Sequence, residues 1–174
     1  LGAPWRDAGK LYNAALLRTI VHNADAIESA KDLADFQSRR QINVMGEKLS
    51  LNNIEHDILR SYFRDPRNHF AILRGYRGGP RLQSAPYDGE NLEFQLERGA
   101  REFLASCSVM STPTGEKVLV PRILKDYKKD FEVEGKLAPF LAKYTADEVR
   151  SVLGRSGDGA LTYRPIDWTL NQKL

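Results

Sequence analysis

The spacing of apolar residues changes between two periods along this chain, and this change is the feature that most limits the fold. From Lys10 to Ala24 the apolar residues recur every three or four positions, which is the period of an amphipathic helix. Further helices are predicted at 26–36, 51–63 and 89–106, hairpins at 42–49 and 108–120, and short strands at 69–73 and 160–163. The sequence therefore predicts an α+β fold: a helix-rich single domain over residues 1–174, with a small, mainly antiparallel sheet built from short strands and hairpins.

Residues with strong end preferences mark where several of these helices begin and end. Ser50 can cap the helix that starts at residue 51, because its hydroxyl accepts a free backbone N–H. Asp65-Pro66 should end that helix, since the residue before proline disfavours helical dihedrals. Thr145 and Glu148 fit a capping box, and Gly154 is placed to stop the helix that follows them. We expect element boundaries at these positions.

Length and composition are typical of one folded domain. The chain has 174 residues, of which 41% are hydrophobic and 28% charged. No apolar run approaches the roughly 20 residues that cross a bilayer, so we expect no membrane span. Lys and Arg (26) nearly balance Asp and Glu (23), which does not favour a nucleic-acid partner. Because the sequence begins at Leu1 and not at Met, we expect a fragment of a longer chain.

The single cysteine excludes an internal disulfide and a cysteine-based zinc site. It is compatible with a reducing compartment such as the cytoplasm. Cys107 follows a predicted helix end, where the helix dipole disfavours a thiolate, so we expect a buried, packed side chain. No metal-binding spacing, serine-nucleophile motif or phosphate loop is present. We therefore predict no metal and no cofactor.

Several segments, in a fixed order, carry a resemblance to a known family. They are Leu11-Tyr12-Asn13-Ala14, Leu49 to His56, Asp65 to Ala71, and Tyr163 to Asn171. In this order they resemble the DUF547 family, which is defined by its sequence and not by a known reaction. The resemblance covers most of the chain, from about Leu11 to Asn171.

The chain departs from the family pattern after His69-Phe70-Ala71. Similar proteins tend to carry Asn-Cys there and Cys-Pro a few residues later, whereas this chain has Leu73-Arg74 and Gly79-Pro80. Any thiol chemistry of similar proteins at these positions is therefore not available to this chain.

Two histidines and one carboxylate are the candidates for catalysis. His56 and Glu55 are adjacent on a predicted helix, and His69 opens a predicted strand. A carboxylate that hydrogen-bonds an imidazole fixes its tautomer and raises its basicity, as a general base requires. A hydrolase or transferase that uses His69 or His56 with Glu55 is one hypothesis. It predicts that these side chains share a pocket with Asn13 and Arg60. The alternative is that both histidines only tie loops to the scaffold.

Arginines are concentrated between positions 60 and 81, where Asp65 is the only acidic residue. The guanidinium group binds carboxylate or phosphate with two parallel hydrogen bonds. The favoured hypothesis is a binding module whose arginine-rich loop contacts an anionic ligand or an acidic protein surface, with Asn13, Arg60, Arg74 and Arg77 as ligand-binding residues. The alternative for this segment is a solvated basic face. The full set of arginines is Arg60, Arg64, Arg67, Arg74, Arg77 and Arg81.

Two further residues suggest structural contacts. Asn13 lies inside a predicted helix, where asparagine has a mediocre propensity, so its amide is expected to bridge to the helix that carries Glu55 and His56. Near the end of the chain, Trp168 is expected to be buried, and Asp167 to accept hydrogen bonds from backbone donors.

Overall fold

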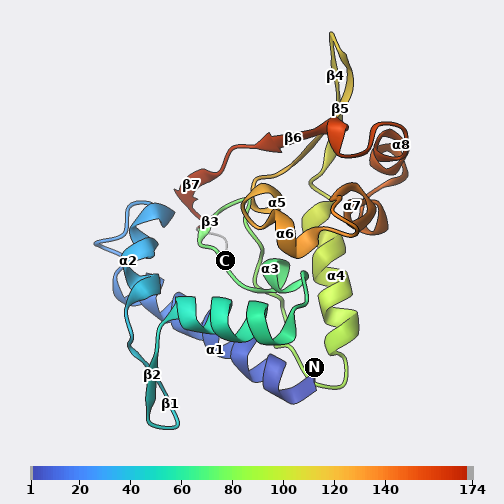
Figure 1. Ribbon diagram of the computed structural model, residues 1–174. Coiled ribbons are helices and arrows are strands. Elements are labelled where there is room, and N and C mark those ends of the chain that lie inside the picture. Colours follow the sequence, from blue (N-terminus) through green and yellow to red (C-terminus); the bar gives the residue numbers. More distant parts are fainter. Residues whose placement is uncertain (1, 172–174) are drawn as a thin grey trace. The chain divides into compact units, whose positions relative to one another are not determined.

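The computed structural model describes residues 2–171 of the chain (Figure 1). Its helices are α1 (Gly2–His22), η1 (Ala30–Asp32), α2 (Leu33–Ser38), η2 (Asn53–Phe63), α3 (Asn68–Ala71), α4 (Leu92–Leu104), α5 (Ile123–Asp126), α6 (Lys128–Phe131), α7 (Ala138–Tyr144), α8 (Asp147–Ser156) and η3 (Gly157–Ala160). Its strands are β1 (Ile42–Val44), β2 (Glu47–Leu49), β3 (Tyr76–Arg77), β4 (Ser108–Thr112), β5 (Gly115–Pro121), β6 (Leu161–Arg164) and β7 (Asp167–Leu170). The helix-rich α+β prediction is confirmed.

The strands are short and form small sheets, as predicted. β1 and β2 make an antiparallel hairpin, β3 pairs with β7, and β4, β5 and β6 make a three-stranded sheet. Within the last sheet β4 and β5 are antiparallel, while β5 and β6 are parallel. Both predicted hairpins therefore form. Among the described residues, none of the helices combines the length and the apolar character that crossing a membrane requires.

The chain divides into two compact units. The first takes the chain up to Gly99 together with the segment that starts at Asp167, and the second is Ala100–Ile166. Helix α4 belongs partly to each. The candidate site residues fall in the first unit, so that unit is described in more detail.

Helix α1 supplies one side of the core of the first unit. Tyr12 and Leu16 lie four positions apart, hence on one face of the helix, and both are fully buried. They belong to one apolar cluster with Ile54 and Leu59 of η2 and with Ile72. Each such side chain contributes on the order of 1.5–3 kcal/mol when it leaves water. This packing fixes α1 and η2, the two helices that carry most of the candidate residues.

The helical segment that leads into η2 starts at residue 51, as the sequence predicts, but η2 has a wider turn than an α-helix. The Ser50 hydroxyl accepts the backbone N–H of Asn53 at 3.1 Å, which confirms its capping role. From Asn53 to Phe63 the helix is a π-helix, a form that is rare at this length. Residues five apart therefore come close to the same face, as Ile54 and Leu59 do in the core. The helix ends at Arg64, which takes a left-handed φ of 54° just before Asp65-Pro66.

The strand predicted at 69–73 is wrong, because most of this segment is the short helix α3. The Asp65 carboxylate accepts the backbone N–H of Arg67 at 2.9 Å, and the backbone carbonyl of Asp65 accepts that of Asn68 at 3.1 Å. These bonds start a helical turn directly after Pro66. A short buried helix and a buried strand both require a continuous apolar run, so the sequence pattern cannot separate them. The chain becomes extended only at Ile72.

The second unit corrects two boundary predictions and confirms one burial prediction. The Thr145 hydroxyl donates to the carbonyl of Leu141 and does not cap α8, so the predicted capping box is absent. Helix α8 continues through Gly154 and ends at Ser156, where Gly157 takes a φ of 53° that glycine tolerates. Cys107 is buried, and this burial raises the pKa of its thiol to about 12. The thiol is therefore neutral at physiological pH.

Candidate functional site

Glu55, Arg74 and His69 form one buried network in the first unit. The guanidinium of Arg74 approaches Oε1 of Glu55 at 2.8 Å and Oε2 at 2.9 Å. A second nitrogen of Arg74 lies 3.1 Å from Nδ1 of His69. Arginine has no acceptor, so this bond requires Nδ1 of His69 to be unprotonated. The guanidinium of Arg74 thus stands between the carboxylate of Glu55 and the imidazole of His69, two of the candidate catalytic residues.

The network is buried to a degree that limits its access to a substrate. His69 is 1% exposed, and the side chains of Glu55 and Arg74 are 3% and 9% exposed. Its members come from η2, α3 and the segment that precedes β3, so their contacts join three elements. A general base has to reach the proton it removes, directly or through one water.

His56 and Arg60 make a separate pair on the half-buried side of η2. Nη1 of Arg60 lies 3.0 Å from Nδ1 of His56, so here too the imidazole nitrogen accepts from a guanidinium. The structure thus brings Glu55 together with His69 through Arg74, and His56 together with Arg60.

The sequence suggested that Asn13 bridges to the helix that carries Glu55 and His56, and this prediction is wrong. Nδ2 of Asn13 donates to the carbonyl of Ala71 at 3.0 Å, and its Oδ1 accepts the backbone N–H of Leu73 at 2.8 Å. Ile72, which lies between Ala71 and Leu73, has an extended backbone. Among the described residues, the carbonyl of Ala71 and the N–H of Leu73 have no strand beside them to pair with. The Asn13 amide supplies one donor and one acceptor at this point, as a neighbouring strand would.

Arg67 and Arg74, two members of the arginine-rich segment, are paired with internal carboxylates. Arg67 donates two hydrogen bonds to Glu93, at 2.6 and 2.8 Å, and it also binds Asp65. These bonds, first to Glu93 and then to Asp65, raise the pKa of the Arg67 guanidinium further above its usual value.

The solvent-exposed arginines of this segment are Arg64, Arg77 and Arg81. Arg77 is 65% exposed and lies 3.7 Å from Asp167, too far for a strong ion pair. The expectation that Trp168 is buried is wrong: it is 39% exposed, packs edge-on against Tyr76 and lies under the ammonium of Lys31. Asp167 accepts the backbone N–H of Thr169, as predicted, and its hydrogen bonds to Thr169 lower the pKa of this carboxyl.

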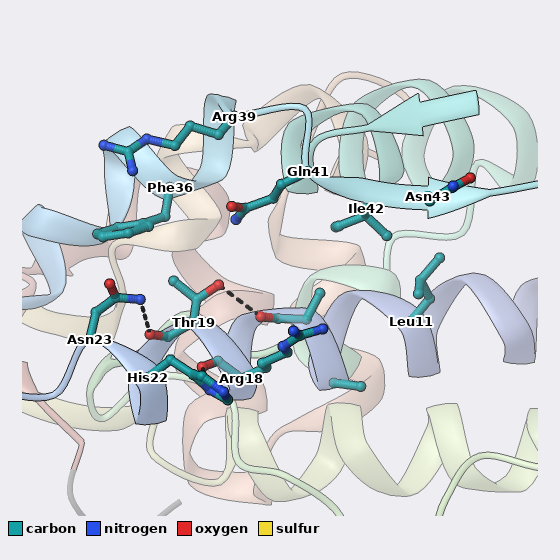
Figure 2. A pocket seen from close by; sticks show the side chains of 12 residues that line it. Leu11, Arg18, Thr19, His22, Asn23, Phe36, Arg39, Gln41, Ile42 and Asn43 are labelled. Carbon is teal, nitrogen blue, oxygen red and sulfur yellow. Dashed lines mark hydrogen bonds between the residues drawn. The ribbon is translucent and has the colours of Figure 1, made fainter. Parts of the chain in front are cut away.

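A groove between α1 and the α2–β1 segment is a candidate site that the sequence hypotheses missed. We call it the α1–β1 groove. Its volume is about 700 Å³, and α1 lies on one side of it while α2 and β1 lie on the other (Figure 2). This volume is within the usual range of ligand pockets. Its polar lining consists of Arg18, Thr19, His22, Asn23, Arg39, Gln41 and Asn43, and its apolar lining of Leu11, Ala14, Ala15, Phe36 and Ile42.

The groove contains two arginines and no carboxylate in its lining. Arg18 comes from α1 and Arg39 follows α2, so the cations stand on opposite sides. Neither guanidinium makes an ion pair with any residue between 2 and 171. The guanidinium of Arg39 lies 4.7 Å from the ring centroid of Phe36, a cation–π contact that leaves its N–H donors available.

The other polar side chains of α1 in the groove bind the helix itself. Thr19 donates to the carbonyl of Ala15 at 2.9 Å, and Asn23 donates to that of Thr19 at 2.8 Å (Figure 2). Nδ1 of His22 lies 2.9 Å from the carbonyl of Arg18; a carbonyl only accepts, so Nδ1 carries a proton. These bonds fix the wall of the groove.

The sequence did not predict the groove, because Arg18 and Arg39 are 21 positions apart and lie on different elements. A weak signal was present, since Arg18 lies seven positions after Leu11 and therefore near the same face of α1. Local arginine density favoured residues 60–81 instead.

The comparisons with known proteins bear on the first unit. The family model described as "protein of unknown function, DUF547" matches residues 11–104, more than half of the chain. The chain belongs to this family. The α1–β1 groove and the Glu55–Arg74–His69 network both lie in the matched region, whereas the resembling segment at 163–171 lies beyond it. No curated protein and no solved structure matches this DUF547 chain.

Among residues 2–171, no three His, Cys, Asp or Glu side chains are grouped so that they could hold a metal ion.

Proposed function

We propose that this DUF547 protein is a binding module for an anionic ligand or an acidic protein partner, and that the α1–β1 groove is the contact site. The observation that carries the proposal is the pair of cations in that groove, Arg18 and Arg39, without a carboxylate to neutralise them. An anionic ligand is also expected from the sequence, where the arginine-rich loop was the favoured contact. Here the main contact is instead with Arg18 and Arg39 of the groove.

The lining of the groove suits a ligand that has both charge and apolar surface. A carboxylate can accept two hydrogen bonds from one guanidinium, and such charge-assisted bonds contribute about 1.5–3 kcal/mol each. Phe36, Ile42 and Leu11 offer apolar contact beside the cations. Apolar walls around a few polar groups are typical of binding sites.

The loop arginines contribute less in this proposal. Arg60 is paired with His56, and Arg74 with Glu55 and His69. Arg77 is exposed and supplies a weaker, peripheral attraction.

An acid/base enzyme is the second candidate, and the observation in its favour is the shared Glu55–Arg74–His69 network. In this candidate His69 or His56 is the base. Turnover of an ester or phosphoester substrate that disappears in His69→Gln or His56→Gln, with the melting temperature unchanged, would establish it.

The binding proposal is tested by calorimetric titration with poly-L-glutamate at low salt. Because each guanidinium supplies charge-assisted bonds, Arg18→Ala and Arg39→Ala should each weaken binding by about tenfold or more. Arg40→Ala is the matched control: Arg40 is exposed and adjacent to Arg39, but it does not line the groove, so affinity should stay within about twofold. Equal losses in Arg39→Ala and Arg40→Ala, or absence of binding by the unaltered protein, would overturn the proposal.

A further inference from the structure

Ile42 and Asn43, successive residues of β1, line the α1–β1 groove together with Gln41, which directly precedes the strand. Successive side chains of a strand point to opposite faces of its sheet. Ile42 and Asn43, whose side chains point to opposite faces, can both line one cavity where the cavity follows the edge of the strand, at the backbone. The groove therefore runs along an edge of β1, with α1 opposite (Figure 2).

Within the part of the chain that the structure describes, no strand lies beside that edge of β1. The β1–β2 sheet has two strands, in the register Ile42↔Leu49, Asn43↔Lys48 and Val44↔Glu47. No backbone hydrogen bond joins β1 to α1 among the described residues. A strand with one paired edge leaves alternate N–H and C=O groups unpaired at the other, and such an edge is a template for another chain.

The turn identifies which residue of β1 faces outward. Met45 and Gly46 form a two-residue connection with φ of 52° and 90°, as in a type I′ hairpin turn. Such a turn is closed by a hydrogen-bonded pair, here Val44 and Glu47, and paired positions alternate along an antiparallel ladder. Asn43 therefore directs its backbone N–H and C=O to the open edge on the groove side, and Lys48 directs its own to the far edge of β2.

We propose that the ligand of the groove is an extended acidic peptide segment, which adds to β1 as a third strand. This inference rests on the proposed function. The peptide backbone pairs with Asn43 at the usual strand spacing of about 4.8 Å, while acidic side chains at alternate positions reach Arg18 and Arg39. Strand addition obtains its affinity from backbone hydrogen bonds and its specificity from alternate side chains.

Charge complementarity favours an acidic peptide over an apolar one. The groove offers two guanidinium groups and no carboxylate, and its apolar lining includes Phe36 and Ile42. An extended chain with acidic and apolar residues in alternation presents both kinds of surface along one strand. A small inorganic anion would use only the cations and would leave the edge of β1 unpaired.

The first experiment compares four peptides by calorimetry. The parent is the alternating peptide acetyl-Glu-Val-Glu-Val-Glu-Val-amide, and the second peptide has the same composition in the block order Glu-Glu-Glu-Val-Val-Val. The third and fourth are the alternating peptide with N-methyl groups on its valines and on its glutamates, respectively. The alternating peptide is expected to bind at least tenfold more tightly than the block peptide. One of the two N-methylated peptides should lose at least tenfold, because its methyl groups replace the N–H donors that face β1.

The second experiment follows backbone amide exchange by NMR. Binding of the alternating peptide should slow exchange at Asn43 by at least tenfold and leave Lys48, its cross-strand neighbour, unchanged. Asn43→Pro should abolish peptide binding, whereas Lys48→Pro, which removes the outward N–H of β2, should preserve it.

The two proposals fail in different ways. Unchanged exchange at Asn43, with both N-methylated peptides binding as well as the parent, would overturn strand addition. Poly-L-glutamate would in that case still depend on Arg18 and Arg39, so anion binding would stand. Loss of that dependence would overturn the proposed function as well.

Discussion

The first unit contains two pairs of arginines whose surroundings differ. Arg67 and Arg74 form the first pair, and Arg18 and Arg39 form the second. The first pair is buried against carboxylates of η2, α4 and the turn after η2. The second pair borders a groove without any carboxylate in its lining. A buried guanidinium that is already paired with a carboxylate stabilises the fold, and one without an ionic partner is available to a ligand.

The comparison shows that a dense run of arginines can contain guanidinium groups that are already paired with carboxylates. The dense segment 60–81 contains the arginines with the strongest internal partners, Arg67 and Arg74. The groove arginines are 21 positions apart in the sequence and lie on opposite walls. The partner of each cation, and not the number of cations nearby, decides its role.

The largest effect is expected for Glu55→Ala, which leaves the guanidinium of Arg74 buried without its carboxylate. Removing one member of a buried ion pair costs about 3–5 kcal/mol, because the remaining charge stays uncompensated. Urea denaturation followed by circular dichroism measures this loss. A loss below about 1 kcal/mol would mean that Arg74 is not held by Glu55 and would break the comparison.

Asn13→Ala is expected to have the next largest effect. It leaves the carbonyl of Ala71 and the N–H of Leu73 without their partner, at about 1–3 kcal/mol for each group. The free energy of unfolding should therefore fall by roughly 2–6 kcal/mol in denaturant titrations. Asn23→Ala is the control, since that amide makes one bond within α1 and its loss should cost about 1 kcal/mol. Equal losses in the two variants would argue against a special role for Asn13.

The smallest effect on stability is expected for Arg18→Ala and Arg39→Ala. Neither guanidinium has an ionic partner among the described residues, so each variant should unfold within about 0.5 kcal/mol of the parent. Differential scanning calorimetry gives the comparison. A loss of more than about 1.5 kcal/mol in the free energy of unfolding would mean that Arg18 and Arg39 stabilise the fold, as Arg67 and Arg74 do.

Local signals predicted the parts of this structure that depend on neighbours in sequence. The cap at Ser50, the hairpins at 42–49 and 108–120, and the burial of Cys107 were all anticipated. Each depends on contacts within a few residues or on the general behaviour of one residue type.

Contacts between distant segments were not predictable in the same way. Asn13 binds groups 58 and 60 positions away, and the pattern around it offered no means to choose between them and η2. The apolar run at 69–73 fits a buried helix as well as a strand. The groove needs Arg18 and Arg39 to be brought together by the packing of α1 and α2, which no local motif encodes.

The most direct test is an NMR titration of the unaltered protein with poly-L-glutamate, observing the Nε–Hε signals of its arginines. Anion binding at the α1–β1 groove predicts shifts for Arg18 and Arg39, with Arg67 and Arg74 unmoved in their internal pairs. Shifts confined to Arg77 and Arg81, with the groove arginines unchanged, would contradict it.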